Sequence, residues 1–140
     1  MEQILLLGLK ISGISQLLLC VGSLAIPRCL KWKERTATLI PLIREMFFTY
    51  AIYILVSHLF FGIVSFWLNH ELLSGSSLAN ALLILMGAWW SGRIVCQFFF
   101  FDRSGIPETP FNKIAETILV TMFIALVTVY WGALLWNLTR

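Results

Sequence analysis

Four long apolar runs alternate with short polar connections along the chain. The runs cover residues 4–27, 46–69, 78–101 and 111–138. Each run exceeds the ~20 residues that an α-helix needs to cross the hydrocarbon core of a bilayer. The pattern predicts an all-α integral membrane protein. It is a four-helix bundle made of two helical hairpins with short loops, forming one transmembrane domain over residues 1–140.

Residues with known preferences for helix ends mark several predicted boundaries. Pro27 closes the first run, and Pro41 precedes the second, where proline can occupy the first helical turn. Ser76 follows a glycine and can cap the third helix. Thr109 followed by Pro110 is typical of an N-cap and the first helical position. These signals confine the connections to short segments.

The composition indicates that lipid is the solvent. Hydrophobic residues occupy 59% of the 140 positions and charged residues 12%, whereas a soluble domain is ~45–50% apolar and ~25% charged. A soluble fold of this size could not hide so much apolar surface. Residues 4–27 are expected to be a retained helix and not a signal peptide, because Glu2 is acidic and Lys10 interrupts the run. The three cysteines lack a CxxC spacing, which argues against a zinc site or a disulfide framework.

Basic residues are concentrated between the apolar runs. The stretch 28–45 holds five Lys and Arg residues, and the 102–113 loop adds Arg103 and Lys113. The opposite side has only Arg140 beyond the helices. By the positive-inside rule, this asymmetry predicts that both termini are extracytoplasmic. We expect a bacterial inner membrane protein whose cations are topology signals and not a nucleic-acid footprint.

Several aromatic residues are interpreted as belonging to the membrane–water interface. Trp32 stands between two lysines in the polar stretch, and Tyr130, Trp131 and Trp136 lie toward the far end of the fourth run. Tryptophan and tyrosine are enriched at this interface because their rings are apolar and carry one polar group. Trp32 is therefore expected at the membrane surface, and the other three near the opposite surface.

Arg93 is the strongest candidate for a functional residue. It lies about nine residues before the end of the third run, or ~13 Å deep. An arginine facing lipid there costs at least ~2.5–3.5 kcal/mol, so we predict that it faces the bundle. Gln97 and Trp89 lie one turn away on the same helix face. Arg93 could tie helices together, contact a ligand or lipid headgroup, or gate a transport path.

Other polar residues lie at similar depths in the remaining helices. His58 is near the middle of the second run, with Tyr50 and Tyr53 toward the basic end, and Gln16 is at a comparable level in the first. Tyr53, His58 and Gln16 could form one polar layer with the arginine. Glu116, about one turn into the fourth helix, is expected to pair with a neighbouring base or to complement the helix N-terminus.

Catalytic, metal-binding and cofactor-binding motifs are missing from the sequence. A haem held by two histidines of one chain is excluded, because His58 and His70 are ~18 Å apart along a helix. No nucleophile or acid–base pair is evident, so an enzyme is the least favoured class, and no cofactor or metal is expected.

Three functions remain open. The first is an accessory or assembly subunit that contacts other membrane proteins or further copies of itself. The second is a binder or carrier of a lipid-like molecule such as a quinone, a polyprenyl compound or a sterol-like compound. Its polar head would be held by the candidate ligand-binding residues, Arg93, Gln97, Tyr50, Tyr53, His58 and Trp89. The third is a small oligomeric transporter.

Overall fold

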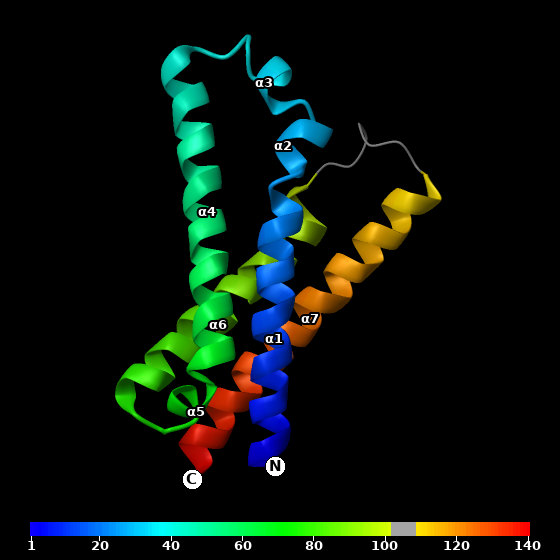
Figure 1. Cartoon of the computed structure of the whole chain (residues 1–140). Helices are drawn as coiled ribbons and strands as arrows, with labels where there is room; N and C mark the ends of the chain where they lie inside the picture. The colour runs from blue at the N-terminus through cyan, green and yellow to red at the C-terminus, as the bar shows by residue number, and fades with distance from the viewer. Residues whose placement is uncertain (102–108) are drawn as a thin grey trace.

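Four long helices make up most of the protein. The structure, a computed structural model, describes residues 1–101 and 109–140, and these two ranges contain helices and no strand. The long helices are α1 (Glu2–Ser23), α4 (Pro41–Trp67), α6 (Ser77–Val95) and α7 (Pro110–Thr139) (Figure 1). Each is long and apolar enough to cross a bilayer. The predicted all-α transmembrane four-helix bundle is confirmed.

The helix ends follow the predicted end signals closely. Ser76 Oγ accepts a hydrogen bond from the Ala79 amide at 3.2 Å, and Thr109 Oγ1 accepts one from the Asn112 amide at 3.2 Å. Both predicted N-caps are therefore confirmed. The second long helix begins at Pro41 and not at residue 46, because proline fits the first helical turn without losing a needed N–H.

The third long helix ends in a π-helical segment, η1 (Cys96–Phe100), inside the predicted run. This segment extends α6 toward the same end of the molecule from which α7 begins (Figure 1). The predicted loop at residues 102–108, with Arg103, lies outside the described residues.

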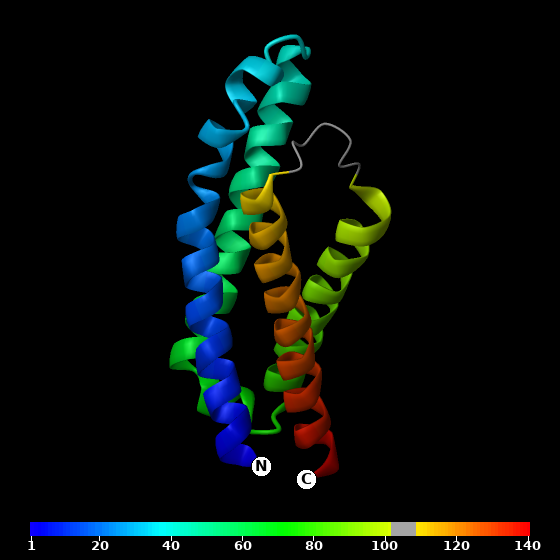
Figure 2. The ribbon, with the colours of Figure 1, turned by 90° about the vertical axis from the view of Figure 1, so that its right-hand side faces the viewer.

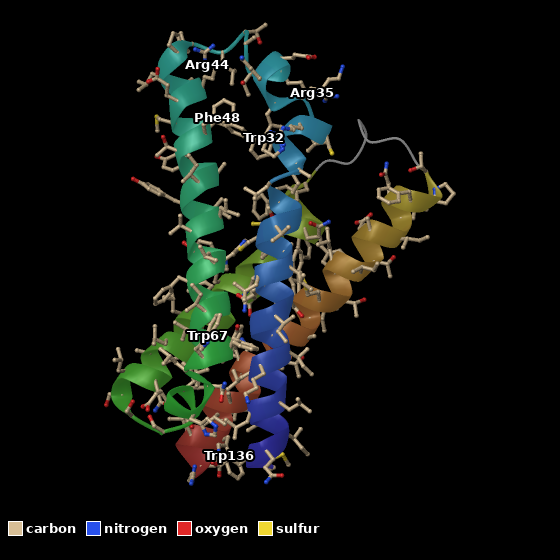
Figure 3. All side chains as sticks on the ribbon, in the orientation of Figure 1. Trp32, Arg35, Arg44, Phe48, Trp67 and Trp136 are labelled. Atoms are coloured by element: carbon tan, nitrogen blue, oxygen red, sulfur yellow. The ribbon has the colours of Figure 1, made fainter. Side chains whose placement is uncertain are left out.

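An elbow (residues 26–44) joins α1 to α4. It contains two single-turn helices, α2 (Ile26–Cys29) and α3 (Trp32–Arg35), and the first residues of α4. The Trp32 ring meets the Phe47 ring edge to face with centroids 4.8 Å apart, and Thr36 Oγ1 donates to the Trp32 carbonyl at 2.7 Å. The elbow is thus folded against the start of α4 and does not extend away from it (Figure 3).

The elbow and the two termini lie at opposite ends of the bundle. Both termini are at the end where α5 (Asn69–Leu72) connects α4 to α6 (Figure 1). Glu2 and Arg140 form an exposed ion pair there, with 3.8 Å between their charged atoms. Each predicted hairpin therefore crosses the long dimension of the bundle and returns.

Close contact between α1 and α4 depends on two glycines. A Cβ atom added at Gly13 would lie 2.7 Å from the Phe66 amide nitrogen and 2.8 Å from the Gly62 carbonyl oxygen. A Cβ atom at Gly62 would lie 3.3 Å from the Gly13 carbonyl oxygen. Small residues let the backbones of transmembrane helices approach closely, which increases their van der Waals contact. These two glycines therefore place α1 directly against α4.

Buried residues of α4, α6 and α7 are confined to the part of the bundle nearer the termini, here called the termini half. They fall within 58–65 of α4, 79–90 of α6 and 123–134 of α7. Those of α1 fall within 9–20, where the buried Cys20 thiol lies 3.8 Å from the Leu55 carbonyl of α4. No residue is buried in 41–57 of α4, 91–95 of α6 or 110–122 of α7, here called the elbow half. In this half α7 leans away from α1 (Figure 1), and the end of α6 leans away from α7 (Figure 2).

Candidate functional site

A hydrogen-bonded polar network lies at the centre of the bundle. The Gln16 side-chain amide of α1 donates to Tyr130 Oη of α7 and to the Ser12 carbonyl, the latter at 3.2 Å. Its carbonyl oxygen accepts from Trp90 Nε1 of α6 at 3.2 Å. Ser65 Oγ of α4 lies 2.7 Å from Tyr130 Oη. The network therefore joins all four long helices through side chains.

The four side chains of this network are completely shielded. Gln16, Ser65, Trp90 and Tyr130 each expose 0% of their surface. Both amide hydrogens and the carbonyl oxygen of Gln16 are used within the protein. A buried polar group that keeps its hydrogen bonds avoids most of its desolvation cost. The network is therefore built to hold helices together, and its groups are not directed at a ligand.

His58 lies beside this network in a pocket of indole rings. Its imidazole stacks on Trp90 with ring centroids 4.8 Å apart and planes 19° apart. Its Nε2 accepts a hydrogen bond from Trp89 Nε1 at 3.1 Å. The side chain is buried, and its Nε2 already accepts the indole N–H of a tryptophan. The structure thus brings together two of the candidate residues, His58 and Trp89, in a closed pair.

Arg93 lies about one helical turn from this pair, toward the elbow half. Its guanidinium carbon is 4.8 Å from the centroid of the Phe101 ring and 5.5 Å from that of Phe123. Phe123 belongs to α7, so the guanidinium contacts the fourth long helix through an aromatic ring. The rings at the guanidinium are these two phenylalanines, whereas Trp89 is engaged with the histidine. Cation–π contacts of this kind stabilise a partly desolvated cation.

Gln97 and Glu116 form a second link between α6 and α7. Gln97 Nε2 of η1 donates to Glu116 Oε1 at 3.4 Å. Both side chains are half-buried, at the level where α7 begins. The long distance indicates a weak hydrogen bond. The pair connects the two helices of the second hairpin in the elbow half.

Tyr50 and Tyr53 lie apart from the other candidate residues. They expose 56% and 63% of their surfaces on α4. Ser57 Oγ donates to the Tyr53 backbone carbonyl at 2.8 Å and does not bring the phenol ring inward. The proposed polar layer of arginine, tyrosine and histidine is therefore not assembled. Among the candidate ligand-binding residues, His58 and Trp89 meet, whereas the others lie at separate places on α4, α6 and η1.

Sequence reasoning missed the centre of the network. Tyr130 was interpreted as an interface residue, and this is wrong, because its side chain is fully buried among four helices. Counting back from Arg140 places Tyr130 about ten residues inside the helix end, or ~15 Å deep, which is the signal that could have identified it. Trp131 also turns inward, since its Nε1 donates to Ser91 Oγ of α6 at 3.2 Å.

A polar recess lies at the termini end of the bundle. Its volume is about 600 Å³, and its lining includes Glu2, His70, Asn137 and Arg140. Asn137 Nδ2 donates to the Leu72 carbonyl at 2.8 Å and to Asn80 Oδ1 at 2.9 Å, which joins α7 to α5 and α6. The recess is formed largely by exposed side chains and by the ends of the chain. It has the character of a solvated surface and not of an enclosed pocket.

An apolar cleft separates α1 from the first half of α7. It measures about 520 Å³. The threonines on its α7 side bond to their own helix, since Thr117 Oγ1 donates to the Lys113 carbonyl and Thr121 Oγ1 to the Thr117 carbonyl, both at 2.8 Å. Their hydroxyl donors are thus satisfied, as is common for threonines in transmembrane helices. The cleft offers an apolar surface suited to a hydrocarbon chain.

Comparisons with known proteins do not assign a family to this chain. Comparisons with protein-family models, with curated proteins and with solved structures found no match. In the two described ranges, no three His, Cys, Asp or Glu residues are placed to hold a metal ion. A function must therefore be argued from the packing and from the polar groups alone.

Proposed function

We propose that this protein is an accessory subunit that binds another membrane protein through its elbow half. The observation that carries the proposal is the contrast between the two halves of the bundle. In the termini half, hydrogen bonds among four buried side chains hold the four long helices together: Gln16, Ser65, Trp90 and Tyr130. In the elbow half, residues 41–57, 91–95 and 110–122 include no buried residue, and only partly buried side chains such as Ile94 and Met122 reach the core.

This contrast favours a partner protein. Lipid solvates both apolar halves equally well, so it gives no reason for one half to be loosely packed. Apolar side chains gain little by leaving lipid for another apolar surface, so association in the membrane depends on shape and on polar contacts. The elbow half offers both. Its helices diverge (Figures 1 and 2), and Tyr50 and Tyr53 present phenol groups on the outer surface of α4. A partner could therefore use the divergence for close packing and the phenols of α4 for hydrogen bonds.

Cross-linking in the membrane tests this proposal. A photoreactive phenylalanine analogue at Tyr53 should yield one discrete cross-linked protein band in cells. The matched control is Leu135, which is exposed to a similar extent, 61% against 63%, but lies in the termini half. A much weaker band is expected from the control position. Equal cross-linking at both positions, or attachment of Tyr53 to lipid alone, would contradict a partner at the elbow half.

We further propose a bacterial inner membrane location with both termini extracytoplasmic. The support is the concentration of cations in the elbow, at the end opposite both termini. In a variant without its three native cysteines, a single cysteine at Ser76 should react with a membrane-impermeant maleimide in intact cells. A cysteine at Thr38 should react only after the cells are opened. The reverse pattern would invert the topology.

A binder of lipid-like molecules remains the second candidate, and the apolar cleft is the observation that favours it. The cleft lies between Gly8 and Ser12 of α1 and Thr121 and Ala125 of α7, and its volume suits an acyl or isoprenoid chain. It lacks an evident polar anchor, which is why this candidate ranks second. In the cross-linking experiment it predicts attachment to lipid and not to protein. The third expectation, a transporter, gains no specific support from the described residues.

A further inference from the structure

The elbow combines a high positive charge with a fixed position at one end of the bundle. It holds five cations against a single carboxylate, that of Glu34. The carboxylate is 3.7 Å from Lys31 Nζ. An exposed ion pair of this kind contributes little to the free energy of folding. The five cations are all exposed: Arg28, Lys31, Lys33, Arg35 and Arg44. The charge is therefore available to a ligand outside the protein.

Large apolar side chains lie between these cations. Leu30, Leu39 and Ile40 are exposed by 47%, 40% and 64%. Trp32 stands between two lysines and is held against Phe47, which sets its level relative to the first turns of α4. Figure 3 shows Trp32, Arg35, Arg44 and Phe48 gathered at this end, with Trp67 and Trp136 at the other. Cations interspersed with exposed apolar groups are typical of a segment that lies in the headgroup region.

The backbone between α2 and α3 adds an independent observation. Lys31 has φ 49° and ψ 46°, in the left-handed region. This conformation costs a side-chain-bearing residue ~1–2 kcal/mol, a cost that glycine avoids. A lysine therefore occupies this turn at a conformational cost. Its ammonium group is exposed at the surface of the elbow, beside the Glu34 carboxylate.

We propose that the elbow is a docking surface for anionic phospholipid headgroups of the bilayer. Cationic clusters beside transmembrane helices attract anionic lipid by ~1 kcal/mol per Lys or Arg close to the surface. An acidic protein segment is the less suitable occupant, because it would leave Leu30, Leu39 and Ile40 exposed to water beside it. In the bilayer, these side chains enter the apolar layer while the lysines and arginines meet phosphate.

Tryptophan quenching in vesicles tests the proposal on the full chain. The protein is reconstituted in phosphatidylcholine vesicles that contain a minority of phosphatidylglycerol, with bromine near the top of the acyl chains of one lipid or the other. Comparison with Trp32→Phe isolates the Trp32 signal. Per mole of brominated lipid, quenching by phosphatidylglycerol should exceed that by phosphatidylcholine about threefold or more, and high salt should remove the difference. Equal quenching by the two lipids would overturn the proposal, and is the result expected for an acidic protein partner.

Matched variants locate the effect in the elbow. Lys31→Gln/Lys33→Gln/Arg35→Gln should bring the ratio of the two quenching constants close to one. Lys31→Arg/Lys33→Arg keeps the charge and should keep the ratio, as should Arg140→Gln at the opposite end. A loss of selectivity in either of these two controls would overturn the assignment. The salt dependence of the unaltered protein provides a test that does not depend on how well any variant folds.

Discussion

Gly13→Ala should destabilise the bundle by about 2 kcal/mol or more, because the added methyl group has no space between α1 and α4. The new Cβ would meet backbone atoms of Gly62 and Phe66 at 2.8 and 2.7 Å, and backbone cannot move aside as a flexible side chain can. The better helix propensity of alanine returns at most about 1 kcal/mol. Unfolding in a detergent titration, followed by circular dichroism, measures the change.

Gly22→Ala is the matched control for this substitution. Gly22 is on the same helix, and a Cβ added there has no neighbouring atom within 4 Å. Its stability should equal or slightly exceed that of the unaltered protein. If the two alanine variants unfold at the same detergent fraction, then the close approach of α1 and α4 is not a source of stability.

Gln16→Leu should lower the free energy of unfolding by about 2 kcal/mol. The substitution preserves much of the side-chain volume but leaves the Trp90 indole N–H without its acceptor and removes a donor from Tyr130. A single hydrogen bond between transmembrane helices is worth only ~0.6 kcal/mol on average and at most ~1.7. Leaving a buried donor unpaired costs ~1–3 kcal/mol. The substitution removes two interhelical hydrogen bonds and leaves the indole N–H unpaired, so the loss of stability should exceed that of one average bond.

Gln3→Leu makes the same chemical change at an exposed position of α1 and should have little effect on stability. The same detergent titration applies to both variants. A Gln16→Leu protein as stable as the Gln3→Leu protein would show that the polar network adds no net stability. The network would then have to be explained by the specificity of helix pairing alone.

The helices could be predicted from the sequence because their signal is strong and local. Length and apolarity identify a transmembrane helix, and the caps at Ser76 and Thr109 follow from residue type. Arg93 could be predicted to face the bundle because exposing its charge to lipid is costly, but the helix that it contacts could not. Each of these inferences depends on one residue or one run and needs no knowledge of its neighbours.

The packing could not be predicted in the same way. In water, the apolar face of a helix shows which side is buried, but in lipid both sides are apolar, and that signal is lost. Tyr53 and His58 lie five positions apart on one helix, yet one is exposed and the other is buried against Trp90. The separation of the two halves depends on helix crossing angles, which are set by contacts such as that at Gly13.

The position of Tyr130 in the sequence determines when the polar network can form during synthesis. Tyr130 belongs to α7, which leaves the ribosome after α1, α4 and α6. Until α7 has entered the membrane, Gln16 and Ser65 lack the phenol group to which both are bonded. A chain that ends before α7 therefore leaves these amide and hydroxyl groups without one of their partners, at a cost in the apolar layer. The entry of α7 into the membrane thus completes the hydrogen bonding of the polar network.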